Sequence, residues 1–146
     1  MLLARGANIW CRSDGGGTVL IAAAGNDDAD PAMIKLILSE LRKRSCSAHP
    51  VHVEINRPYR AQTVKMKVLQ VLSSALYSCR LRGNPLVVGI ATDVGTTALH
   101  NAAKRGDREV FKLLLDAGCD PSKRTALGLT AADVALLHGH QPRCPF

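Results

Sequence analysis

The sequence predicts an all-α protein built from stacked copies of one helix pair. Aromatic residues make up only 3% of the chain, which suits packing by alanine and leucine. Apolar residues in several segments recur with the period of an amphipathic helix. A set of marker residues also repeats 33 positions apart, which is typical of stacked helical units. Gly95, Thr97, Ala98, Ala102 and Gly106 are matched by Gly128, Thr130, Ala131, Ala135 and Gly139.

The clearest unit covers residues 95–127. Thr97 is predicted to cap a first helix, and Gly106 to end it. Asp107 is predicted to cap a second helix, which ends before Gly118. One such pair cannot bury its apolar side alone, so we expect it to stack on further units. The apolar side of the second helix is predicted to contain Val110, Leu113, Leu114 and Ala117, at positions i, i+3, i+4 and i+7.

Two stretches of this unit resemble the ankyrin repeat. Residues 97–103 read Thr-Ala-Leu-His-Asn-Ala-Ala where that family has T-P-L-H-x-A-A. Residues 113–121 read Leu-Leu-Leu-Asp-Ala-Gly-Cys-Asp-Pro where the family has L-L-L-x-x-G-A-D-P. The resemblance implies a solenoid that binds other proteins and does not catalyse a reaction. It also implies a structural role for His100, which would hydrogen-bond backbone at the turn and hold one unit on the next.

Weaker matches lie on both sides of the clear unit. Residues 2–44 are predicted to form a first repeat region, in which Gly16 to Ala24 follows the G-x-T-P-L-H-x-A-A pattern with Ile21 in place of His. Residues 128–146 are predicted to form a partial last repeat. We therefore expect truncated units at both ends. Asp30-Pro31 is a strong helix start, and the apolar stripe predicted to follow it is Met33, Ile34, Ile37, Leu38 and Leu41.

The middle of the chain leaves two alternatives open. Residues 45–62 are predicted to be an extended loop insertion, because they contain two prolines and the β-rich stretch Val51–Ile55. Residues 63–94 are predicted to be a degenerate repeat. The distance from Thr18 to Thr97 is not a multiple of 33, so either one repeat carries a long insertion or one repeat has lost its signature. The whole chain, 1–146, is predicted to be a single ankyrin-like domain of about three units.

No catalytic residue, cofactor, metal ion or small-molecule substrate is predicted. A structural zinc site needs four ligands, and each local cluster offers three. The glycines of residues 14–18 are not followed by the lysine of a phosphate-binding loop, so a flexible repeat tip is expected there. Residues 88–97 resemble the phosphate-binding turn of actin-like ATPases, but too few residues follow for the large two-lobed domain. The two clusters are Cys46, His49 and His52, and His138, His140 and Cys144.

Net charge and composition limit the kinds of partner and the cellular compartment that we expect. The net charge is +7, which permits an acidic protein partner or a nucleic acid. Nucleic acid is less expected, because the basic residues are dispersed and aromatic side chains are nearly absent. No apolar run is long enough to cross a membrane. Five cysteines at irregular spacings and the lack of a secretory leader predict a cytoplasmic or nuclear protein.

We therefore predict a protein-binding scaffold or adaptor. Two alternatives stay open: a basic surface that binds nucleic acid or another polyanion, and a regulatory or targeting part of a larger signalling or ubiquitin-pathway enzyme. The resemblance implies that a partner contacts the variable positions at the loop tips and on the first helices. These are Asp93, Val94, Thr96, Lys104 and Arg105 in the clear unit, and Ala126, Leu127, Leu129, Leu137 and His138 in the next.

Overall fold

A computed structural model describes residues 6–26, 28, 30–47, 50–60, 67–68, 71–72, 75 and 93–140. The regular structure in these ranges is mostly helical, as predicted, and its β structure includes an isolated antiparallel bridge between Arg12 and Thr18. None of the helices in the described ranges combines the length and the hydropathy needed to span a bilayer. The helices described over their full length are α1 (Val19–Gly25), α2 (Pro31–Lys43), α3 (Val51–Ile55), α6 (Ala98–Arg105), α7 (Arg108–Asp116) and α8 (Ala131–Leu137), and residues 67–68, 71–72 and 75 are also helical.

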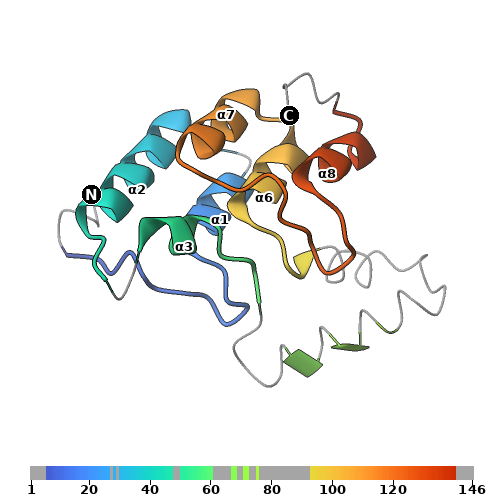
Figure 1. The fold of residues 1–146 in the computed structure, drawn as a ribbon, viewed down its shortest axis with the longest axis horizontal. Helices are drawn as coiled ribbons and strands as arrows, with labels where there is room; N and C mark the ends of the chain where they lie inside the picture. Colours follow the sequence, from blue (N-terminus) through green and yellow to red (C-terminus); the bar gives the residue numbers. More distant parts are fainter. Residues whose placement is uncertain are drawn as a thin grey trace.

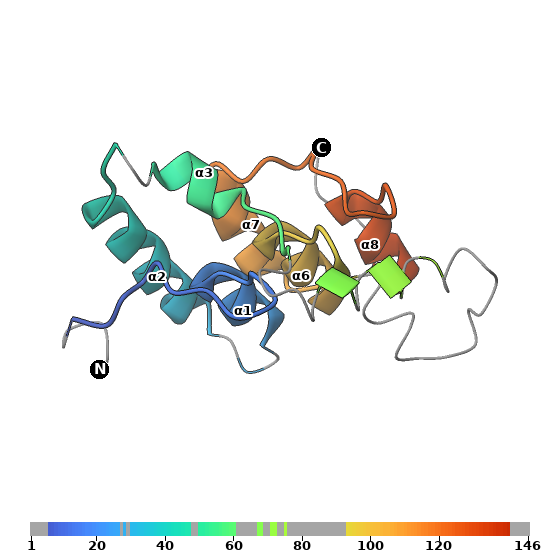
Figure 2. The same cartoon turned by 90° about the horizontal axis from the view of Figure 1, so that it is seen from below.

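The helices form two rows (Figure 1). In the inner row α1 contacts α6, and α6 contacts α8. In the outer row α2 contacts α7. Figure 2 shows the inner row from below, with α6 between α1 and α8. The pair α1–α2 therefore lies directly against the pair α6–α7, which is the arrangement expected of consecutive repeats.

Local side-chain capping explains where these helices begin. Thr18 accepts a hydrogen bond from the Ile21 N–H at 3.2 Å at the start of α1. At the start of α7, Asp107 accepts from the Val110 N–H at 3.0 Å. Each bond satisfies an amide in the first turn that has no partner within the helix. Gly106 ends α6 with a φ of 73°, a left-handed conformation that favours glycine. The cap at Asp107 and the end of α6 at Gly106 confirm the sequence predictions.

Small residues allow the inner helices to approach closely. Ala98 and Ala102 of α6 are fully buried. A Cβ on Gly25 of α1 would lie 2.9 Å from the Asn101 side-chain nitrogen on α6, so a larger residue there would displace the Asn101 side chain. The core continues into the outer row, where larger side chains fill the space between α2 and α7. Its most deeply buried aliphatic residues there are Ile34, Val110 and Leu114.

Two expectations about apolar segments are wrong. Met33 was assigned to the buried stripe of α2, but its side chain is 37% exposed. Val51–Ile55 was expected to be extended, but it forms the short helix α3. The helical turn buries Glu54 and Ile55, and Glu54 pairs with Arg12 at 3.2 Å. Tertiary contacts of this kind override the β-propensity of the two valines.

Extended segments, which we call fingers, lead into each inner helix. The first finger comprises residues 9–18, the second residues 57–60 and 93–97, and the third residues 119–130. One backbone hydrogen bond closes the base of each finger at the equivalent place. The donor and acceptor are Ser13 N and Gly17 O (3.1 Å), Tyr59 N and Thr96 O (2.6 Å), and Thr125 N and Leu129 O (2.9 Å).

The second finger differs from the others in length. The closing bond spans four residues in the first and third fingers and 37 residues in the second. The donor and acceptor of the closing bond, Tyr59 and Thr96, are thus 33 residues further apart in the sequence than those of the other two fingers. Most of these additional residues, and with them most of the predicted degenerate repeat 63–94, lie outside the described residues.

The glycines of residues 14–18 are packed and do not form an open tip. Gly15 and Gly16 are buried. A Cβ on Gly15 would overlap the Tyr59 hydroxyl, and one on Gly16 would overlap the Arg60 carbonyl oxygen. Gly16 also has a φ of 79°. The first finger therefore needs glycine because the second finger lies directly against it.

Candidate functional site

An open groove of about 620 Å³ lies along the inner helices and the second finger. α1, α6 and the end of α8 each contribute to it, and the second finger forms its rim. Half of its lining residues belong to the predicted partner-binding set: Asp93, Thr96, Lys104, Arg105 and His138. The other half are Ile21, Ala22, Gly25, Tyr59 and Asn101.

Charge in the groove is concentrated on α6. The Lys104 Nζ lies 3.6 Å from the Asp93 Oδ1, and the two side chains are 45% and 49% exposed. An ion pair this exposed contributes little to stability. Arg105 is more enclosed, since its side chain is 15% exposed and pairs with Asp107 at 3.7 Å. Lys104 is therefore the groove cation that a ligand can reach, whereas Arg105 holds the fold together.

A shallow hollow of about 40 Å³ joins the groove between α6 and α8. Asp93, Thr96 and Lys104 border it on the α6 side. Leu129, Val134 and Leu137 give its other side an apolar lining. Six residues of the predicted partner-binding set thus meet around one depression: Asp93, Thr96, Lys104, Leu129, Leu137 and His138.

The three inner helices present different side chains at equivalent positions. Their capping residues Thr18, Thr97 and Thr130 define the alignment. Seven positions after the cap, where an inner helix faces the groove, α1 has glycine, α6 lysine and α8 leucine. The groove thus changes from small, through cationic, to apolar along the stack. The three residues are Gly25, Lys104 and Leu137.

Three predicted residues do not line the groove or the hollow. Val94 and Ala126 are joined by a hydrogen bond from the Ala126 N–H to the Val94 carbonyl, at 2.9 Å. They and the neighbouring Leu127 lie where the second and third fingers contact each other. Leu127 is half-buried, whereas Ala126 is exposed.

Sequence reasoning missed the groove residues of the first unit, Tyr59 of the second finger and Asn101 of α6. Ala22 stands at the same position as Asn101 when α1 and α6 are aligned on their capping threonines. Extending the variable-position alignment from Lys104 to α1 would have found Gly25, but not Ala22, because Asn101 is not in the predicted set. Tyr59 had no such signal, because 33 additional residues separate the two sides of its finger.

His100 has a structural role, as predicted. Its ring is 1% exposed. The Thr97 N–H donates to Nδ1 at 3.2 Å, and Nε2 lies 3.2 Å from the Leu129 carbonyl oxygen in the third finger. Because Nδ1 accepts, Nε2 carries the proton and donates to Leu129. Burial lowers the pKa of His100, while backbone hydrogen bonds to Leu129 and Lys123 act in the opposite direction, so the ring is neutral.

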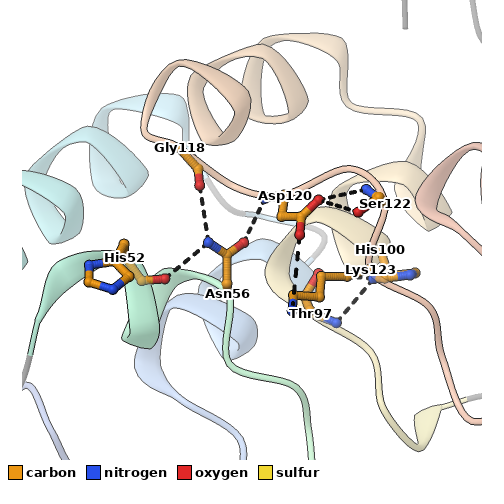
Figure 3. A network of polar contacts seen from close by, with 8 residues as sticks. All are labelled: His52, Asn56, Thr97, His100, Gly118, Asp120, Ser122 and Lys123. Atoms are coloured by element: carbon orange, nitrogen blue, oxygen red, sulfur yellow. Dashed lines mark hydrogen bonds and ion pairs between the residues drawn. The ribbon is translucent and has the colours of Figure 1, made fainter.

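Asn56, directly after α3, connects the second finger to the start of the third (Figure 3). Its amide nitrogen donates to the Gly118 carbonyl at 3.1 Å, and its side-chain oxygen accepts from the Asp120 N–H at 2.6 Å. It also donates to the His52 carbonyl at 3.0 Å. Asp120 in turn accepts from the Ser122 hydroxyl at 2.6 Å, which lowers the pKa of Asp120. These hydrogen bonds link the end of α3 to the start of the third finger.

The described residues do not assemble a metal-ligand cluster of three or more side chains. His49 and Cys144, each a member of one predicted cluster, lie outside the described residues. Cys119 is buried, and burial raises the pKa of its thiol to about 12. A thiol with this pKa is not a nucleophile at neutral pH.

The arrangement defines a class of protein, a stack of helix pairs with fingers on one side. Comparison with known sequences agrees: residues 82–135 match the sequence family described as "Ankyrin repeats (many copies)", so this segment consists of ankyrin repeats. The chain is also 41% identical over 61 residues to a protein named Espin-like protein from Homo sapiens. The matched part is 42% of this chain, and it spans about 6% of that relative's length. Ankyrin repeats are generally non-catalytic modules for protein–protein interaction.

Proposed function

We propose that this chain is a non-catalytic scaffold or adaptor that binds a protein partner through the concave face of about three ankyrin units. The observation that carries the proposal is the groove. Residues of α1, α6, the end of α8 and the second finger meet there, and half of them belong to the partner-binding set that the resemblance implies. A groove along the inner helices is where solenoids of this class present an extended binding surface.

The three-unit count rests on the finger bases. Equivalent hydrogen bonds occur in three fingers, and α1 contacts α6 without a helix pair between them. We infer that the additional residues of the second finger are an insertion in that finger and not a further unit. Removing residues 61–92 and joining the two sides with a short turn is therefore expected to leave a cooperatively folding array. Loss of cooperative unfolding in that variant would contradict the insertion.

The test of the proposed function is recovery of a partner from a cell lysate, with this chain as bait. Lys104→Glu reverses the accessible charge in the groove. Lys112→Glu makes the same change on the exposed surface of the outer helix α7 and serves as the matched control. Circular dichroism confirms that both variants are folded. We expect one discrete protein to be recovered by the wild type and the control and to be lost with Lys104→Glu. Equal recovery by all three forms would contradict the proposal.

The net charge of +7 supports one alternative, a polyanion-binding surface. Nuclease treatment of the lysate separates the two functions. Recovery that disappears with nuclease, and that falls steeply with salt, would favour nucleic acid. We place the protein in the cytoplasm or the nucleus, and its role within a larger signalling or ubiquitin-pathway protein remains a prediction.

A further inference from the structure

We propose that the groove recognises a peptide segment in which an acidic side chain stands close to an aliphatic one. The carboxylate would bind Lys104, and the aliphatic side chain would enter the hollow between α6 and α8. This inference rests on the proposed function and names the chemistry of its partner.

The exposure of two consecutive leucines in α8 has two different causes. Leu136 is 58% exposed and aligns with Ala103, which is 3% exposed in α6 because α7 covers it. Leu137 is 69% exposed and aligns with Lys104, which faces the groove in α6 as well. Leu137 is therefore a large apolar side chain at a position that the fold itself leaves open. Such a side chain at a binding surface provides favourable contact area for an apolar partner group.

The lining of the hollow favours an apolar group. Its volume of about 40 Å³ gives room for the branched end of a leucine, isoleucine or valine. Leu129 and Val134 complete the apolar lining, so an aliphatic group that enters loses water on several sides.

Lys104 determines the charge of the neighbouring group. Its contact with Asp93 is long, at 3.6 Å, and half-exposed, so a ligand carboxylate can compete for the ammonium group at small cost. The other cation, Arg105, adds positive potential from a fixed position, because its Nη1 lies 3.4 Å from the Ala24 carbonyl oxygen, to which it donates. Arg105 already pairs with Asp107 at 3.7 Å, so Lys104, whose contact with Asp93 is exposed, is the groove cation that a ligand carboxylate can approach. An acidic group beside Leu137 is the complement of this arrangement.

The inference is tested by selecting binders from a random twelve-residue peptide display library on the full-length immobilised chain. We expect the enriched peptides to combine Asp or Glu with Leu, Ile or Val within a few positions. On Lys104→Glu, we expect the acidic preference to change to Lys or Arg while the aliphatic preference remains. On Leu137→Ser, we expect the aliphatic preference to be lost, and the best wild-type peptide to bind about tenfold more weakly.

Matched controls separate these effects from general changes in the surface. Lys112→Glu and Leu136→Ser alter the same residue types away from the groove, and we expect both preferences to be unchanged. Absence of an acidic–aliphatic pairing in the wild-type selection, or a pairing that Lys104→Glu does not alter, would overturn the inference. If the lysate partner is still lost with Lys104→Glu in that case, the proposed function stands and the peptide chemistry is wrong. If the lysate partner is retained as well, both are wrong.

Discussion

α6 and α8 are equivalent inner helices that are capped by different chemistries. At α6 the third helical position is His100, which accepts from the Thr97 N–H and also donates to Leu129 in the next finger. At α8 the same position is Asp133, which accepts from both the N–H and the hydroxyl of Thr130 at 2.8 and 2.7 Å. The carboxylate completes the cap locally, whereas the imidazole also joins two units. Equivalent positions can thus keep the same backbone geometry while they differ in how strongly neighbouring units are coupled.

The largest expected effect comes from removing these two caps. His100→Ala deletes a buried ring and leaves the Thr97 N–H and the Leu129 carbonyl without partners. We expect a loss of about 3 kcal/mol in the free energy of unfolding, measured by urea denaturation. Asp133→Ala is expected to cost clearly less, because its partners are accessible to water. An equal loss in the two variants would show that His100 does not couple the units.

Two equivalent glycines, one in the second finger and one in the third, allow these fingers to be compared. Gly95 and Gly128 have φ values of 81° and 79°. A Cβ on Gly95 would lie 2.8 Å from the Ala126 backbone nitrogen, whereas one on Gly128 would have no described neighbour within 4 Å. Both alanine variants carry the left-handed strain of about 1 kcal/mol. We expect Gly95→Ala to cost about 1 kcal/mol more than Gly128→Ala in the same denaturation assay, because the third finger must also move.

The smallest expected effect is a pH dependence. The folded protein holds the pKa of His100 below its usual value of 6.5, mainly through burial. Between the two pKa values the unfolded chain binds more protons, so the stabilisation is full above pH 6.5 and declines as the pH falls below it. We expect the melting temperature to decrease between pH 6.5 and pH 5.

His138 provides the control for that experiment. Its pKa is also lowered, by burial and then by the charges of Lys104 and His140, so it contributes with the same sign. We expect His138→Asn to retain most of the pH dependence and His100→Asn to lose most of it. If His138→Asn instead lost most of the pH dependence and His100→Asn retained it, the titrating group would be His138 in the groove and not His100 at the contact between α6 and the third finger.

Local signals allowed much of the fold to be predicted. The caps at Asp30, Thr97, Asp107 and Thr130 and the glycine at the end of α6 act within one helical turn, and the sequence displays them directly. The structural role of His100 followed from the resemblance. Of the predicted site residues, those on α6 and α8 were the easiest to place, because a fixed spacing connects them.

Contacts between distant segments could not be predicted in this way. Tyr59 fits against Gly15 only because the first two fingers lie side by side, and the sequence contains no spacing that relates them. Asn56 contacts Gly118 and Asp120 across more than 60 residues. The helix α3 forms because such contacts bury its end. Each of these features depends on tertiary structure, which a local pattern does not encode.

Among the described helices α6 is packed between two inner helices, α1 and α8, whereas the main contact of α8 is with α6. Among the described residues α6 contacts α1, α7 and α8, whereas α8 contacts α6 and has one fully buried residue, Ala131. Native-state hydrogen exchange of the backbone amides tests this most directly. We expect the amides of α6 to exchange only with global unfolding, and those of α8 to exchange earlier, through local opening. Equal protection of the two helices, or slower exchange in α8, would contradict it.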